Sequence, residues 1–323
     1  MQAILAVTVP FFALVLAGWL AARRGLLPAS AIPGLNAYVL YFALPCLLLR
    51  FGMGTPVLEL LNPWLLAIYL LCALLIVSFT IATSLNSRIG LKDASFGALV
   101  AAFPNTGFMG VPLLVALLGP TAAGPAICSI LADLFVTSSL CIALSQLHAP
   151  QQGQGAGLAA LRAVRGALAN PLPWSIALGA ALSAAGLRLS GPIDTVVRML
   201  ADSASPVALF SIGAVLWRAG LQTQHHTRLI DYLPVALIKL FLHPLLVLVL
   251  GAAAQQLGAP VSAFQLMVLT LVAALPSASN AALLAERFGA DSGRVARIIM
   301  SSTLLAFASF SALAWCLGIR PGG

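Results

Sequence analysis

The sequence predicts an all-α integral membrane protein with ten transmembrane helices in two inverted five-helix repeats. Three observations lead to this prediction: an apolar composition, apolar runs of transmembrane length, and two prolines at matching positions within those runs. The chain is 61% hydrophobic and 7% charged, whereas soluble domains have about 25% charged residues. Its apolar runs are about 18–25 residues long, as membrane-spanning helices require. The alternating polarity of a membrane β-barrel is absent from the sequence.

The ten expected spans are separated by turn-forming residues such as Gly119-Pro120, Asn170-Pro171 and Gly191-Pro192. The spans cover residues 2–21, 35–51, 63–85, 95–118, 123–147, 171–187, 195–217, 231–251, 262–285 and 296–318. Arg23-Arg24 follow the first run, whereas a signal peptide carries its positive charge before the apolar run. We therefore expect residues 2–21 to be a retained first span.

The basic residues indicate which loops face the cytoplasm. Loops after odd-numbered spans hold Arg23, Arg24, Arg88, Lys92, Arg162, Arg165, Arg218, Arg228, Arg287, Arg294 and Arg297. Loops on the opposite side hold Arg50, Arg188 and Arg320. Because short cytoplasmic loops are rich in Lys and Arg, we expect the odd loops inside and both termini outside the plasma (inner) membrane. This distribution explains the net charge of +8 without a nucleic-acid partner.

Two halves of the chain share short motifs in the same order. A P-x-x-L-x-x-x-G pattern at Pro45, Leu48 and Gly52 recurs at Pro206, Leu209 and Gly213, and residues 101–104 match 273–276. We therefore predict repeats at residues 1–147 and 171–323, joined by a short cytoplasmic linker at 148–170. Because five spans is an odd number, the second repeat enters the membrane from the opposite side, which is an arrangement typical of transporters.

The fourth and ninth spans are each interrupted by proline and small polar residues. Pro104 and Pro276 cannot continue an unbroken helix, and paired broken helices are the best sequence indication of a transporter's binding site. We expect the two breaks to cross near the middle of the membrane and to bind an anion at the half-helices that follow. The expected substrate-binding residues are Pro104, Asn105, Thr106, Gly107, Pro276, Ser277, Ser279 and Asn280. The alternative is that the Asn and Ser side chains only cap the broken helix ends.

Charged residues inside the expected spans require an explanation, because each costs roughly 2.5–3.5 kcal/mol at the membrane centre. Asp133 lies in the fifth span, Asp202 in the seventh, and Lys239 and His243 in the eighth. We expect Asp133 and Lys239 to form a buried pair beside the crossing. The lysine then replaces a coupling cation, or Asp133 titrates and couples transport to protons; the alternative is a purely structural salt bridge. His243 is expected to be a packed residue.

Cofactors and enzymatic chemistry are not indicated. The five cysteines form neither a CxxC nor a CxxH pattern, and neither HExxH nor GxSxG occurs. We therefore expect no metal and no enzymatic activity, with H+ or Na+ as the possible coupling ions.

Several segments together resemble the auxin efflux carrier family, which includes plant PIN carriers and bacterial malate or malonate permeases. Residues 103–114 are similar to the family's P-N-T-x-x-M-G-x-P-L-L motif, and further similarity lies at 43–45, 209–213, 239–244, 275–280 and 286–291. The resemblance implies a fold like that of bile-acid symporters and NhaA. It also implies a scaffold of spans 1, 2, 6 and 7, a transport domain of spans 3–5 and 8–10, and an elevator movement. The family's crossing asparagine corresponds to Asn105.

The expected function is secondary transport of small organic anions, namely carboxylates such as indole-3-acetate, malate or malonate. The resemblance further implies a homodimer formed through spans 2 and 7, surrounded by membrane lipids. The long hydrophilic loop of plant carriers is replaced here by about 20 residues, so its phosphorylation control should be missing. The alternatives are a membrane sensor or scaffold subunit that keeps the fold without transport, and an intramembrane enzyme.

Overall fold

The computed structural model describes residues 1–55, 62–147, 165, 168, 170–222 and 227–319. Secondary structure in these ranges is helical, apart from one isolated antiparallel β-bridge. Most of the expected linker 148–170 lies outside the described residues, as do Arg162, Arg320, His148, His225 and His226.

Seven helices in the described ranges are long and apolar enough to cross a membrane. Four of them are single α-helices: α1 (Gln2–Arg23), α5 (Pro63–Ser84), α12 (Gly191–Gln222) and α17 (Ser292–Cys316). The other three each contain two α-helical segments: Ala29–Gly54 contains α2 (Ile32–Tyr38) and α3 (Leu44–Gly54), Pro120–Ser145 contains α8 (Ala123–Ala132) and α9 (Ser138–Ser145), and Leu229–Gln256 contains α13 (Leu229–Leu237) and α14 (His243–Gln256). Together, the seven helices coincide with seven of the ten expected spans. The prediction of an all-α membrane protein is therefore confirmed.

The three other expected spans carry shorter helices. The fourth consists of α6 (Leu91–Ala102), the π-helical turn η3 (Thr106–Gly110) and α7 (Val111–Leu118), and the ninth of α15 (Ala263–Ala273) and α16 (Ala281–Arg287). Both are interrupted where Pro104 and Pro276 were expected to break them. The sixth carries α11 (Pro171–Ala184).

Three of the helical segments are widened into a π-helical turn just before a proline. In η2 (Val39–Ala43), η3 and η6 (Ile238–Leu242), the N–H of the residue that precedes Pro45, Pro112 or Pro244 bonds to a carbonyl five residues back. A proline ring clashes with the carbonyl four residues back in a regular helix, and the wider turn relieves that clash. The same widening at η5 (Asp133–Thr137) is not explained by a proline.

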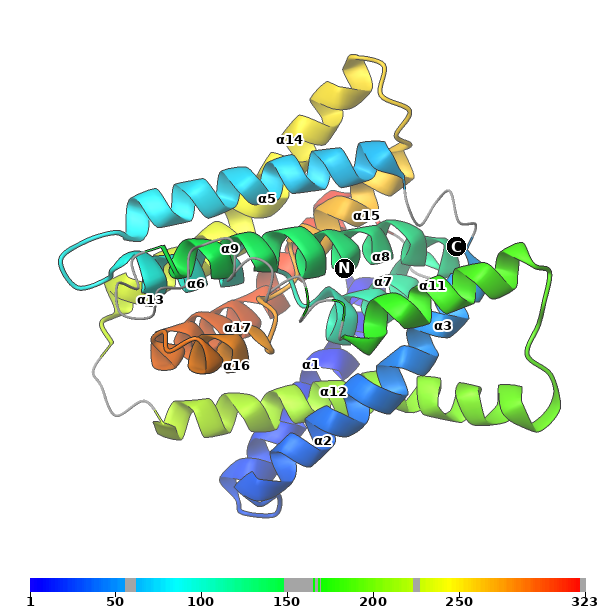
Figure 1. The fold of residues 1–323 in the computed structure, drawn as a ribbon, viewed down its shortest axis with the longest axis horizontal. Helices are drawn as coiled ribbons and strands as arrows, with labels where there is room; N and C mark the ends of the chain where they lie inside the picture. The colour runs from blue at the N-terminus through cyan, green and yellow to red at the C-terminus, as the bar shows by residue number, and fades with distance from the viewer. Residues whose placement is uncertain (56–61, 148–164, 166–167, 169, 223–226, 320–323) are drawn as a thin grey trace.

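Two pairs of helices make the closest backbone contacts. α12 lies along one side of the molecule in the view of Figure 1 and packs against α1, while α11 packs against α3. A Cβ atom at Gly18 of α1 would meet the carbonyl of Phe210, and one at Gly213 of α12 would meet the carbonyl of Val15. Gly52 of α3 and Gly179 of α11 face each other in the same way. Small residues that let backbones approach are typical of helix interfaces in membranes.

This close contact predicts the effect of one added methyl group. Gly213→Ala should lower the free energy of unfolding by about 1–3 kcal/mol, because the new Cβ must push the backbone of α1 away. Gly54→Ala is the matched control, since its Cβ would meet nothing within 4 Å. Thermal unfolding of the purified variants in detergent measures the difference. Equal stability of the two variants would contradict the close packing of α1 against α12.

Candidate functional site

The two broken helices cross and hydrogen-bond to each other through their backbones. The N–H of Asn105 donates to the carbonyl of Pro276 at 2.8 Å, and the N–H of Ala278 donates to the carbonyl of Phe103 at 3.0 Å. Pro104 and Ser277 are the opposed residues of this short antiparallel bridge. Backbone polar groups inside a membrane must find partners within the protein. The bridge supplies these partners where the prolines end α6 and α15.

Asn105 and Thr106 are buried at this crossing with unused polar atoms. Their exposed fractions are 3% and 1%. Neither the Oδ1 atom of Asn105 nor the Oγ1 atom of Thr106 has a hydrogen-bond partner among the described residues. The Oδ1 atom of Asn280, on the other broken helix, is also buried without a hydrogen-bond partner among the described residues. Buried polar atoms of native proteins are nearly always hydrogen-bonded, so these three require an explanation.

The alternative that the two asparagines cap the following helices is wrong. Asn105 precedes η3 and Asn280 precedes α16, and neither side chain makes a capping hydrogen bond. Elsewhere the chain does use such caps: the side chain of Asn62 accepts the N–H groups of Trp64 and Leu65 at the start of α5. Asn105 and Asn280 therefore lack the capping hydrogen bonds that Asn62 makes.

The other expected site residues divide into structural and accessible ones. The Ser277 hydroxyl donates to the carbonyl of Val100 at 2.6 Å, and its N–H donates to the hydroxyl of Ser302 at 3.2 Å. Ser277 thus ties the crossing to α6 and α17, and Ser302 belongs to no motif by which it could have been predicted. Pro104 and Pro276 are buried, while Gly107 and Ser279 are partly exposed.

The register of the bridge separates the two asparagines. Asn105 lies one residue beyond Pro104 in its segment, and Asn280 lies three residues beyond Ser277 in the antiparallel one. They therefore leave the bridge in opposite directions, rather than facing each other across it.

Asp133 and Lys239 are both fully buried, but they do not form the direct pair expected from the sequence. No ion pair joins them in the part of the chain that the structure describes. Both carboxylate oxygens of Asp133 are occupied, one by the hydroxyl of Tyr69 at 2.7 Å and the other by that of Thr137 at 3.0 Å. These donors replace the lysine as partners of the carboxylate.

Lys239 instead bonds to the end of the broken helix α15. Its Nζ atom donates to the carbonyl of Ala273 at 2.7 Å and lies 3.1 Å from Nδ1 of His243. A helix C-terminus carries partial negative charge and free carbonyls, so it attracts a cation. The ring of Tyr69 lies 5.9 Å from that of His243, which brings the two halves of the buried cluster together.

Arg294 is a structural residue that the sequence analysis missed. It was counted among the loop charges, but its exposed fraction is 2%. Its guanidinium donates to the carbonyls of Asp231 and Asp93 at 2.7 and 2.8 Å, and to the hydroxyl of Ser84 at 3.4 Å. Gly97 leaves space for it, because a Cβ there would lie 2.7 Å from the guanidinium. Arg294 therefore joins the ends of α5, α6, α13 and α17.

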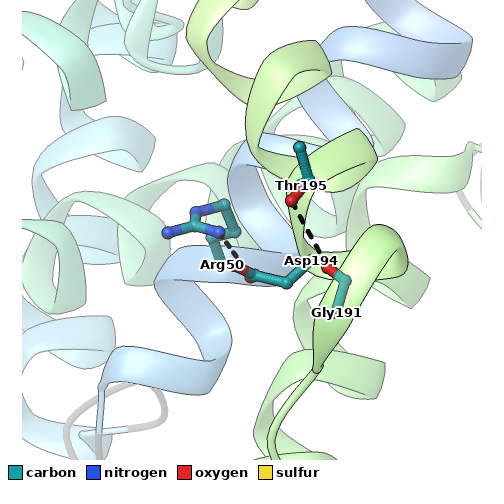
Figure 2. A network of polar contacts seen from close by, with 4 residues as sticks. All are labelled: Arg50, Gly191, Asp194 and Thr195. Atoms are coloured by element: carbon teal, nitrogen blue, oxygen red, sulfur yellow. Dashed lines mark hydrogen bonds and ion pairs between the residues drawn. The ribbon is translucent and has the colours of Figure 1, made fainter.

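A second polar contact joins α3 to the start of α12. Arg50 and Asp194 form an ion pair at 2.9 Å, and the hydroxyl of Thr195 donates to the carbonyl of Gly191 at 3.3 Å (Figure 2). The Arg50 side chain is 37% exposed, in keeping with its expected place near a span end. Such a pair contributes at most about 1 kcal/mol. Asp202, which was expected among the buried charges, is exposed on α12.

Metal-ligating side chains do not cluster in the described ranges. No group of three or more His, Cys, Asp or Glu residues there is placed to hold a metal ion, and the five cysteines are free. The described polar contacts most relevant to a binding site are thus the crossing itself and the cluster around Asp133 and Lys239.

Known proteins resemble the chain over most of its length. The family model described as "Membrane transport protein" matches residues 3–154 and 158–315. A Rhizobium meliloti (strain 1021) protein with the provisional name malonate transporter is 28% identical over 325 residues, covering 100% of this chain and 98% of that protein.

Two further relatives are named only as uncharacterized transporters. One, from Methanothermobacter thermautotrophicus, is 27% identical over 92% of each chain. The other, YfdV of Escherichia coli (strain K12), is 25% identical over 61% of this chain and 59% of its own length. The residues matched by the family model include both broken helices. The chain belongs to the membrane transport protein family, the family of the auxin efflux carriers.

Proposed function

We propose that this protein is a secondary transporter of small carboxylates, which bind where the two broken helices cross. The observation that carries this proposal is the buried, unused hydroxyl of Thr106, which can donate to a carboxylate, beside Asn105, whose unused amide oxygen can accept from a bound water or a protonated acid. Leaving a buried polar group unsatisfied costs about 1–3 kcal/mol. A ligand bound at the crossing can supply the missing hydrogen bonds.

The surroundings of Asn105 favour an anion. The helix formed by η3 and α7 begins directly after it, and the first N–H groups of a helix have no intrahelical acceptor. Here Thr106 and Met109 find acceptors at Pro104 and Asn105, which leaves the N–H groups of Gly107 and Phe108 for a ligand. The positive end of the helix dipole also attracts negative charge. The Asn105 amide adds two N–H donors and one acceptor, so it suits a carboxylate oxygen.

Malonate is the first substrate to test, because a full-length relative carries that name provisionally. The separation of Asn105 from Asn280 across the bridge favours Asn105 as the principal ligand residue. Ser279 and Asn280 then contact the far end of a dicarboxylate. α16 has only seven residues, so its N-terminus contributes less than that of η3 and α7.

We further propose the inverted-repeat architecture with an elevator movement. In an inverted repeat, span 6 is the equivalent of span 1, and span 7 is the equivalent of span 2. A contact between spans 1 and 7 must then recur between their equivalents, spans 6 and 2. The glycine contacts of Gly18 with α12 and of Gly179 with α3 follow this rule. The hydrogen bonds of Lys239, Ser277 and Arg294 stay within spans 3–5 and 8–10. These contacts support a transport domain that moves as one body against spans 1, 2, 6 and 7.

The assembly and orientation follow the same proposal. Two copies associate through spans 2 and 7 in the plasma (inner) membrane, with both termini outside. The charge asymmetry of the loops supports this orientation.

Counterflow in proteoliposomes tests the function. Vesicles loaded with unlabelled malonate should take up external [14C]malonate above the level of protein-free vesicles, and malate or indole-3-acetate should compete if it shares the site. Protease protection verifies that the protein is inserted. Inserted protein that exchanges none of the three acids would contradict carboxylate transport and favour the sensor or scaffold alternative.

A further inference from the structure

The Lys239 ammonium is the hydrogen-bond partner of the second broken helix at the point where that helix ends. In a regular helix the carbonyl of Ala273 would accept the N–H of residue 277. Ser277 instead donates its N–H to Ser302. The carbonyl therefore depends on Lys239, which reaches it from η6 at 2.7 Å. Any change in the charge of this lysine acts directly on the end of α15.

The second neighbour of the ammonium is another basic group. Lys239 Nζ and His243 Nδ1 are 3.1 Å apart, one helical turn from each other, and both side chains are fully buried. Two positive charges at this distance would repel each other by about 5 kcal/mol even at an effective dielectric constant of 20. An ammonium N–H can instead donate to a neutral imidazole. The pair thus accommodates one excess proton between its two nitrogens.

The other nitrogen of His243 identifies the pair as unusual. Its Nε2 atom is buried and has no hydrogen-bond partner among the described residues. Buried polar atoms usually have a hydrogen-bond partner, so a buried imidazole with one unpartnered nitrogen requires an explanation. Its position beside Lys239 gives the imidazole a role as proton acceptor.

Two ionisable groups from neighbouring helices interact with this pair: Tyr69 of α5, whose ring lies 5.9 Å from that of His243, and Asp133 of η5, whose charge acts on Lys239. Cys72 and Cys128 lie beside Tyr69, and Cys141 lies beside Asp133, one step further from the pair. Asp133 has hydroxyl donors on both oxygens, an arrangement that stabilises the carboxylate form. Its complete burial opposes that charge, so we assign the exchangeable proton to the basic pair on the geometry of Lys239 and His243 alone.

We propose that Lys239 and His243 form a proton-binding site in which one shared proton holds the end of α15 at the crossing and moves with the substrate anion. This inference rests on the proposed function. With the proton bound, the basic pair carries one positive charge, which favours an anion at the crossing. When the proton leaves, this attraction is lost. Proton and anion then bind together, with one proton for each anion carried.

Hydrogen exchange tests the proton site without any substrate. The measured quantity is the protection of backbone N–H groups in peptides that cover residues 274–281, corrected for intrinsic exchange rates. In the wild type, this protection should fall as pH rises. Lys239→Met should give low protection at every pH, and Lys239→Arg, with a permanent charge, should remove the pH dependence. Asp133→Asn should keep a pH-dependent, shifted profile. A pH dependence that survives in Lys239→Met, or disappears only in Asp133→Asn, would overturn the proposal.

Proton-driven uptake tests the coupling. With no membrane potential, a gradient of one pH unit, acid outside, should allow about tenfold accumulation of [14C]malonate for one proton per malonate. In Lys239→Met, the pH gradient should no longer raise malonate uptake above the counterflow that the same variant shows without a gradient. Lys92→Met, which changes the second of the chain's two lysines, should behave as the wild type. Counterflow without stimulation in the wild type would reject the proton site and leave carboxylate transport standing. Absence of counterflow would reject malonate transport, and hydrogen exchange would then decide the proton site alone.

Discussion

Arg294→Ala should lower the free energy of unfolding by about 3–5 kcal/mol. The substitution removes three hydrogen bonds from a charged donor, each worth about 1.5–3 kcal/mol. Part of this loss is offset, because the variant no longer has to bury a charged group when it folds. It also leaves a void beside Gly97 that the rigid helix ends cannot fill. Four elements, α5, α6, α13 and α17, lose their common contact. Denaturant or thermal unfolding of the purified protein in detergent measures the loss.

Arg297→Ala is the matched control for this prediction. Arg297 lies on the same helix, but its guanidinium lies over the ring of Tyr232 at 5.9 Å, and its Nε atom has no partner within the described ranges. A cation–π contact of this kind contributes about 0.5–1 kcal/mol, so its loss should be several times smaller. The loss of stability in Arg294→Lys should lie between the losses in Arg294→Ala and Arg297→Ala, because a lysine has one ammonium group in place of the branched set of guanidinium donors. Similar small losses in Arg294→Ala and Arg297→Ala would show that the buried guanidinium is not a main support.

Asn105→Ala should reduce carboxylate transport by about 10- to 150-fold without destabilising the protein. A hydrogen bond to a charged ligand is worth about 1.5–3 kcal/mol, which corresponds to this loss in rate or affinity. In the empty protein, however, the Asn105 side chain satisfies nothing that would be lost. Removing an unsatisfied buried group should leave stability unchanged or raise it by about 1 kcal/mol. Counterflow and thermal unfolding are measured on the same preparation.

Asn62→Ala should give the opposite result. This asparagine caps α5 through two hydrogen bonds and lies outside the crossing, so its loss should cost about 1 kcal/mol of stability and leave transport intact. If Asn105→Ala lowers stability as Asn62→Ala does, while transport persists, then Asn105 is a structural residue and the binding site lies elsewhere.

The sequence was sufficient for the helical architecture because the membrane imposes simple rules on it. Apolar runs of sufficient length predicted the seven long helices, and the need to satisfy every backbone group made the breaks at Pro104 and Pro276 conspicuous. Asn105 was found for the same reason, since it follows the first of these prolines. The π-helical turn at η5 could not be predicted, because its stretch contains no proline.

The partners of the buried charges were less predictable. Asp133 and Lys239 were paired on the ground that opposite charges in a membrane should meet. A carboxylate is equally satisfied by hydroxyl groups, and Tyr69 and Thr137 supply them. A lysine is equally satisfied by a free carbonyl, and the break in α15 creates one at Ala273. Arg294 was misjudged because hydropathy places it in a loop, while its acceptors are the carbonyls of Asp231 and Asp93, distant in sequence.

The backbone bridge between Pro104 and Ser277 has a consequence for how such proteins diversify. Because main-chain atoms hold the two segments together, the junction does not depend on which side chains surround it. Asn105, Ser279 and Asn280 can therefore be exchanged over generations while the junction itself persists. If these side chains bind the substrate as proposed, single substitutions can change the substrate preference while the fold is retained.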